Sequence, residues 1–170
     1  MIDLIRSRRS IRKYIEKQIS SEIIEELKEV ALRAPTSRNR KEWLFWFVTD
    51  KELLEKLSEA KAAGSKMIGK APLAIVIGAK ESECDVWIED TSIASTLLQM
   101  NAQSYGLGSV WVQIRERLTK EKQKSEDRVK EILKVSDSDV RIASIIAMGY
   151  PDEEKLPIEK SALKWDAIQL

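Results

Sequence analysis

The sequence predicts an α+β domain in three layers, with a central mixed β-sheet flanked by helices. Strand-like and helix-like segments interleave along the 170 residues, but without a regular strand–helix–strand alternation. Four expected strands are too few for a full doubly wound sheet, and no GxGxxG motif follows a strand to open a dinucleotide-binding fold. A chain of this length fits one domain, residues 1–170, with a core of its own.

The helices are predicted from apolar residues at helical spacing. The clearest helix covers residues 20–33, where Ser20 and Ser21 can cap the first turn and Pro35 follows the end. Gly106 is well placed to end the longest helix in a left-handed turn. The other expected helical segments are a short amphipathic turn at residues 1–6, then residues 50 to about 62, 86–105 and 125–134.

The strands are predicted from short apolar and β-branched runs at residues 43–49, 72–79, 109–114 and 141–149. The run at 72–79 is continuously apolar, so we expect both of its faces to be covered. The tail, residues 152–170, is mixed, with a short strand or a turn of helix expected around residues 161–169.

The overall charge excludes some partners. The formal net charge is +1, from 29 basic and 28 acidic residues, so no global field attracts nucleic acid or an anionic membrane. The N-terminus lacks the apolar run of a signal peptide, and no stretch approaches the length of a membrane span. We therefore expect a cytoplasmic protein.

Residue types missing from the chain limit its chemistry. There is one cysteine, Cys84, and no histidine. This excludes a disulfide framework, a zinc knuckle and histidine-based catalysis, and the sequence predicts no metal site. Cys84 is interpreted as a loop or strand-end thiol without a role. An enzyme of this composition would most economically rely on a bound cofactor.

Three short stretches could bind a phosphorylated cofactor. Residues 8–14 (RRSIRKY) offer Arg8, Arg9, Ser10 and Arg12, a set of guanidinium and hydroxyl groups that suits a phosphate monoester, although a solvated basic patch has the same composition. Residues 34–43 (APTSRNRKEW) form a polar turn, or an ordinary helix-to-strand loop. Residues 106–113 (GLGSVWVQ) end a helix and start a buried strand.

In this order, and with Gly149-Tyr150-Pro151 near the end, these stretches resemble the nitroreductase family of FMN-dependent oxidoreductases. The resemblance implies a nitroreductase-like fold and a homodimer with FMN at the interface, the tail packing on the partner subunit. It also implies ping-pong transfer of hydride from NAD(P)H to an electron-poor acceptor, such as a nitroaromatic compound or a quinone. The flavin N5 atom carries this chemistry, so no catalytic side chain is implied.

The resemblance also assigns roles to the arginine segment. Arg8 would contact the phosphate, Ser10 and Arg9 the ribityl–phosphate end, and Arg12 the pyrimidine edge of the flavin. There a fixed positive charge stabilises the reduced ring. A lysine of the tail completes the phosphate site, Lys160 as the first match and Lys155 as the second.

The other two stretches gain roles in the same way. Thr36, Ser37 and Asn39 would reach the flavin bound mainly by the partner subunit. The backbone of Gln113 and Ile114 would lie beside N5.

The chain departs from the family pattern at Lys41-Glu42, where Gln-Pro is usual. This leaves open a noncatalytic flavin-binding regulator, which flavin bleaching by NAD(P)H would distinguish from an enzyme. A relative with different flavin chemistry, such as reductive dehalogenation, also stays open.

Overall fold

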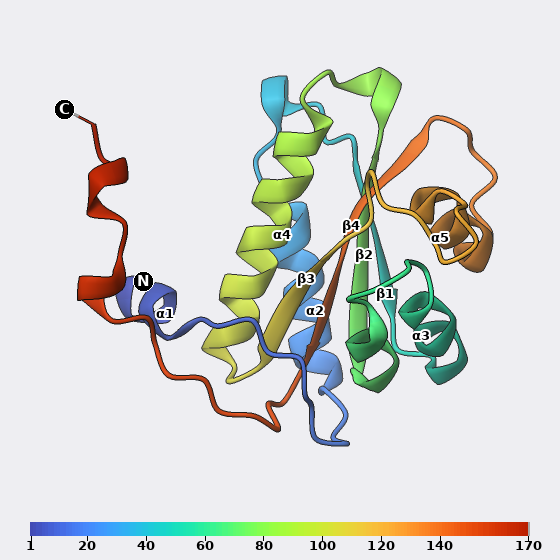
Figure 1. Cartoon of the computed structure of the whole chain (residues 1–170). Coiled ribbons are helices and arrows are strands. Elements are labelled where there is room, and N and C mark those ends of the chain that lie inside the picture. Colours follow the sequence, from blue (N-terminus) through green and yellow to red (C-terminus); the bar gives the residue numbers. More distant parts are fainter. Residues whose placement is uncertain (170) are drawn as a thin grey trace.

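The computed structural model describes residues 1–169 and shows a four-stranded sheet between two layers of helix (Figure 1). The strands are β1 (Trp43–Val48), β2 (Leu73–Lys80), β3 (Gly108–Gln113) and β4 (Val140–Gly149), in the order β1-β2-β4-β3. The α-helices are α1 (Ile2–Ser7), α2 (Ser21–Leu32), α3 (Lys51–Ser58), α4 (Trp87–Ser104) and α5 (Ser125–Leu133). The predicted α+β class and three layers are confirmed.

The prediction of a mixed sheet was wrong, because all three strand pairs run antiparallel. Strands β2 and β3 do run parallel to each other, joined by the crossover helix α4. However, β4 lies between them and pairs antiparallel with both. The sequence pattern placed a helix between these two strands in the chain but did not indicate the strand inserted between them in the sheet. Parallel pairing is limited, among the described residues, to an isolated bridge between Ser10 and Ser109.

The central strand β2 is covered on both faces, as its apolar run predicted. Leu73, Ile75 and Ile77 pack in the cluster that contains residues of α2 and α4, whereas Ala74 and Val76 pack in the cluster that contains residues of α3 and α5. Successive side chains of a strand point to opposite faces, so one strand supplies both cores. No helix within residues 1–169 is long and apolar enough to cross a membrane.

Helix α3 ends at Ser58, four residues before the predicted end. The amide of Ala62 donates to the carbonyl of Leu118 at 2.9 Å, instead of continuing the helix. The tail contains two short 3₁₀ turns, Lys160–Ala162 and Trp165–Ala167. The left-handed turn predicted at Gly106 is present, with φ of 70°.

The segment after α1 lies along β3. The amide of Ile11 donates to the carbonyl of Ser109 at 3.0 Å. The hydroxyl of Tyr14 donates to the carbonyls of Ile11 and Ala147, at 2.7 and 3.1 Å. Close contact at Gly108 fixes this arrangement, because a Cβ added there would lie 2.6 Å from the Cβ of Ile11.

We predict that Gly108→Ala lowers the free energy of unfolding by about 1–3 kcal/mol, because the added methyl group overpacks a filled contact. Urea unfolding followed by tryptophan fluorescence measures this change. Gly106→Asn is the matched control, since the site has open space around it and asparagine tolerates the left-handed conformation. Equal stability of the two variants would contradict the packing argument.

Candidate functional site

The predicted phosphate-binding arginines lie at the outer edge of β3. The bridge between Ser10 and Ser109 holds this segment against the strand. Arg8 and Arg9 are partly buried and Arg12 is exposed. Within residues 1–169, none of these three guanidinium groups takes part in an ion pair. Their positive charge is therefore available to an anionic ligand.

The start of the tail is tied to the same segment. The carboxylate of Glu153 accepts from the backbone amides of Arg12 and Lys13, the latter at 3.2 Å. The Arg12 amide and then Lys155 lower the pKa of the Glu153 carboxyl, so it stays ionised at neutral pH. Lys155 lies 3.4 Å from this carboxylate and donates to the carbonyl of Ser10 at 2.6 Å. Lys155 thus adds a further cation to those of the arginine segment.

Of the two tail lysines considered, the structure brings Lys155 to the arginine segment. Lys160 instead lies over the ring of Trp165, 5.7 Å from its centroid, in the exposed last part of the tail. Lys160 was the first match by sequence and Lys155 the second. The choice between them depended on how the tail turns after Gly149, which spacing alone does not fix.

The loop with Thr36, Ser37 and Asn39 is held at the first turn of α4. The amide of Ser37 donates to Asp90 Oδ2 at 2.8 Å, and the amide of Lys41 donates to Thr36 Oγ1 at 2.9 Å. Three non-glycine residues of this loop, Arg38, Asn39 and Lys41, have φ between 53° and 57°. These contacts hold the loop in a conformation that L-residues rarely adopt.

Glu42 follows this loop and is buried, with 2% of its surface exposed. Both of its carboxylate oxygens lack a hydrogen-bond partner among the described residues. The carboxylates of Glu42 and Asp90 and the thiol of Cys84 come together, with one ligand atom of each within 4.8 Å of the others. Burial, and then the adjacent Asp90, raises the pKa of the Glu42 carboxyl.

At the other end of β3, the backbone groups of Gln113 and Ile114 point in different directions. The amide of Ile114 donates to the carbonyl of Ala143 at 3.2 Å, so it points into the sheet. Backbone groups of an antiparallel strand alternate in direction, so those of Gln113 point to the open edge. The Gln113 carbonyl accordingly lies 3.4 Å from Lys61 Nζ. Of the two predicted residues, Gln113 therefore has the backbone available to a ligand.

The arginine segment and the Thr36–Asn39 loop form two separate groups within one chain. The arginine segment lies beside the start of β3, just after α4 ends, whereas the Thr36–Asn39 loop lies at the beginning of α4 (Figure 1). From Asp90 to Tyr105, a helical rise of 1.5 Å per residue separates these ends by about 22 Å.

Sequence reasoning gave no positioning role to three residues that hold the two groups in place: Tyr14, Asp90 and Glu153. Tyr14 donates a hydrogen bond to a backbone carbonyl far away in the sequence, and the other two accept one from a distant backbone amide. The one signal available in the sequence was at Asp90, an acidic residue near the start of a long predicted helix. Nothing local indicated the partners.

Comparisons with known proteins agree with this architecture. The sequence matches the Nitroreductase family over residues 5–66 and 59–150. A protein of Archaeoglobus fulgidus, provisionally named NADH dehydrogenase/NAD(P)H nitroreductase, is 36% identical over 158 residues, covering 91% of this chain and 87% of that protein. A Bacillus subtilis protein provisionally named NAD(P)H nitroreductase YfhC is 30% identical, covering 89% and 84%.

Among solved structures, an FMN-dependent nitroreductase from Clostridium difficile R20291 superimposes with a TM-score of 0.97 at 39% identity, covering 100% of this chain and 98% of that one. A structure from Parabacteroides distasonis, provisionally named NADH dehydrogenase/NAD(P)H nitroreductase, has a TM-score of 0.88 at 28% identity, covering 99% and 96%. The sequence matches and the shared fold together lead to one conclusion: this chain belongs to the nitroreductase family.

Proposed function

We propose that this chain is an FMN-dependent oxidoreductase that transfers hydride from NAD(P)H to an electron-poor acceptor, such as a nitroaromatic compound or a quinone. One observation carries the proposal: three arginines that form no ion pair within residues 1–169 line the β3 edge of a chain that is 39% identical to an FMN-dependent nitroreductase. Relatives named NAD(P)H nitroreductases support the choice of reductant.

The donor set fits the phosphate end of FMN. Arg8 and Arg9 would bind the phosphate, and guanidinium groups suit this because they offer paired donors in a plane. Lys155 adds a further positive charge beside Ser10. The ionised Glu153 repels anions, but its Oε1 atom already accepts from two backbone amides and pairs with Lys155.

Other residues would orient the ring. Arg12 would place a fixed positive charge at its pyrimidine edge, and the outward-facing backbone amide of Gln113 would donate to it. FMN, when bound, accepts and donates hydride, which protein side chains do not do. The protein contributes binding and orientation, which account for much of such catalysis.

We propose that the site is completed by a second copy of the chain. FMN cannot bridge the roughly 22 Å along α4 that separates the arginine segment from the Thr36–Asn39 loop, so the loop would come from the partner. Exposed apolar side chains on three segments support such a dimer. They are Ile2 and Ile5 of α1, Ile93 and Leu97 of α4, and Leu156, Ile158, Leu163, Trp165 and Ile168 of the tail.

The first prediction from this proposal concerns the absorption spectrum of the protein. We expect the purified protein to show flavin absorption near one FMN per chain and to bleach when NADH or NADPH is added without oxygen. Flavin that stays oxidised with both nucleotides would favour the noncatalytic flavin-binding regulator. A colourless protein that does not take up FMN would overturn the proposal.

A second prediction tests the phosphate site. Arg8→Ala removes a charge-assisted contact worth about 1.5–3 kcal/mol, so we expect FMN to bind about 10–100-fold more weakly and the dimer to dissociate more readily. Equilibrium dialysis and analytical ultracentrifugation measure the two effects. Arg6→Ala is the control, because Arg6 is exposed and paired with Asp3. Unchanged FMN retention in Arg8→Ala would refute the assignment.

A third prediction tests whether two chains share each site. Arg8→Ala and Asn39→Ala chains, each poor in FMN alone, should regain binding when coexpressed. Random pairing makes half of the dimers mixed, and each mixed dimer has one intact site of two, so about a quarter of the wild-type sites should return. No recovery on mixing would place both residues in a site made by one chain.

A further inference from the structure

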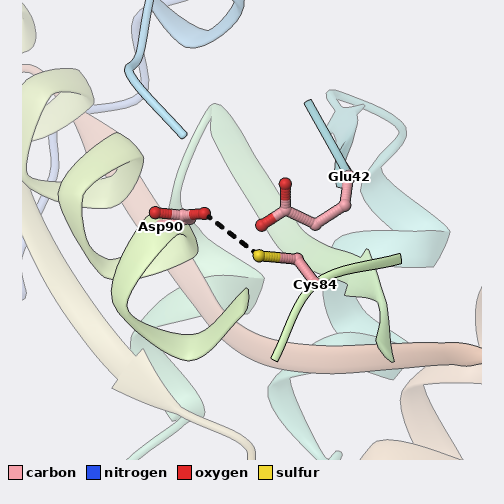
Figure 2. A group of neighbouring side chains, drawn as sticks. All are labelled: Glu42, Cys84 and Asp90. Carbon is pink, nitrogen blue, oxygen red and sulfur yellow. Dashed lines mark hydrogen bonds between the residues drawn. The ribbon is translucent and has the colours of Figure 1, made fainter. Parts of the chain in front are cut away.

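Beneath the Thr36–Asn39 loop lies a buried cluster that the proposed flavin chemistry does not use. It consists of Glu42 just before β1, Cys84 after β2, and Asp90 in the first turn of α4, which are 2%, 3% and 5% exposed. Figure 2 shows the Glu42 carboxylate turned toward the Cys84 sulfur and Asp90. Cys84 Sγ and Asp90 Oδ2 are 3.7 Å apart.

The cluster is acidic and lacks a compensating charge. Within residues 1–169, neither Glu42 nor Asp90 takes part in an ion pair, and both Glu42 oxygens lack a hydrogen-bond partner. A buried carboxylate without a partner is costly, so either a proton or a cation must offset it.

A shared proton would satisfy only part of the cluster. It would bond one oxygen of Glu42 to Asp90. The second Glu42 oxygen would then depend on the Cys84 thiol, a weak donor whose sulfur is directed at Asp90 Oδ2 instead. A divalent cation would offset two of the three negative charges of the ionised groups and bond to all three side chains. It would also displace the thiol proton of Cys84 to solvent.

We propose that Glu42, Cys84 and Asp90 bind a zinc-class divalent cation. A thiolate ligand favours zinc over magnesium or calcium, which take oxygen ligands. Zinc with sulfur at about 2.3 Å and oxygen at about 2.0 Å places neighbouring tetrahedral ligand atoms about 3.5 Å apart, close to the 3.7 Å between Cys84 and Asp90. A second carboxylate oxygen or water fills the fourth position.

The surroundings suit a fixed metal site. The backbone of Glu42 is held by β2, because its carbonyl accepts from the amide of Lys80 at 3.1 Å. Cys84 packs in an apolar cluster with Ala79, Trp87 and Ala143, which shields its sulfur from bulk solvent. Asp90 already accepts from the Ser37 amide, as metal-bound carboxylates commonly do from outer-shell donors. The ion would therefore join the Thr36–Asn39 loop, the turn after β2 and α4.

The test uses flavin-free, metal-free protein, so that its outcome does not depend on the proposed oxidoreductase activity. Zn²⁺ is titrated without added thiols or oxygen, in competition with a chromophoric chelator. We expect one Zn²⁺ per chain, and at least about tenfold weaker binding in Cys84→Ser and in Glu42→Gln, since even outer-shell changes cost that much. Glu83→Gln is the matched control, because Glu83 precedes Cys84 and is exposed.

Two further readouts separate a metal site from a proton-sharing cluster. Co²⁺ should give sulfur-to-cobalt charge-transfer absorption in the wild type and in Glu83→Gln, but not in Cys84→Ser. Zn²⁺ should raise the Tm of the first two proteins, because a ligand of the folded state stabilises it. Zinc binding that is no tighter in the wild type than in Cys84→Ser and Glu42→Gln, or no binding at all, would overturn the proposal. The cluster would then hold a proton instead.

Discussion

Helix α4 is the constraint on which the rest of the site depends. Its first turn holds the Thr36–Asn39 loop through the bond from the Ser37 amide to Asp90. Its last turn leads through Gly106 into β3, against which the arginine segment lies. A rigid helix of fixed rise thus sets the separation between the two groups within one chain.

The sequence predictions that held are those that depend on local residue patterns. The order of helices and strands and the burial of β2 were predictable, because each follows from local apolar spacing. The antiparallel sheet was not, because it depends on β4 entering between β2 and β3. Such pairing joins segments far apart in the sequence, and the residue pattern of each strand is compatible with either direction.

The candidate site, too, could be predicted only in part. Residue types and order indicated the arginine segment and the polar loop. The choice of Lys155 over Lys160 beside Ser10, and of Gln113 over Ile114 as the outward-facing backbone, depends on tail direction and strand alternation. The acidic cluster was hidden for a related reason. Glu42 stood out only as a departure from the family pattern, and Cys84 only as a single thiol, until the fold brought them to Asp90.

The left-handed backbone of the Thr36–Asn39 loop has a consequence for how this protein can change. Arg38 and Lys41 each hold a conformation that costs such residues roughly 1 kcal/mol or more, whereas an asparagine, as at Asn39, tolerates it. Because this strain lies outside the hydrophobic core, a substitution that relieves it could raise the free energy of unfolding without repacking any helix. The loop next to the proposed flavin is thus also a place where variants can gain stability.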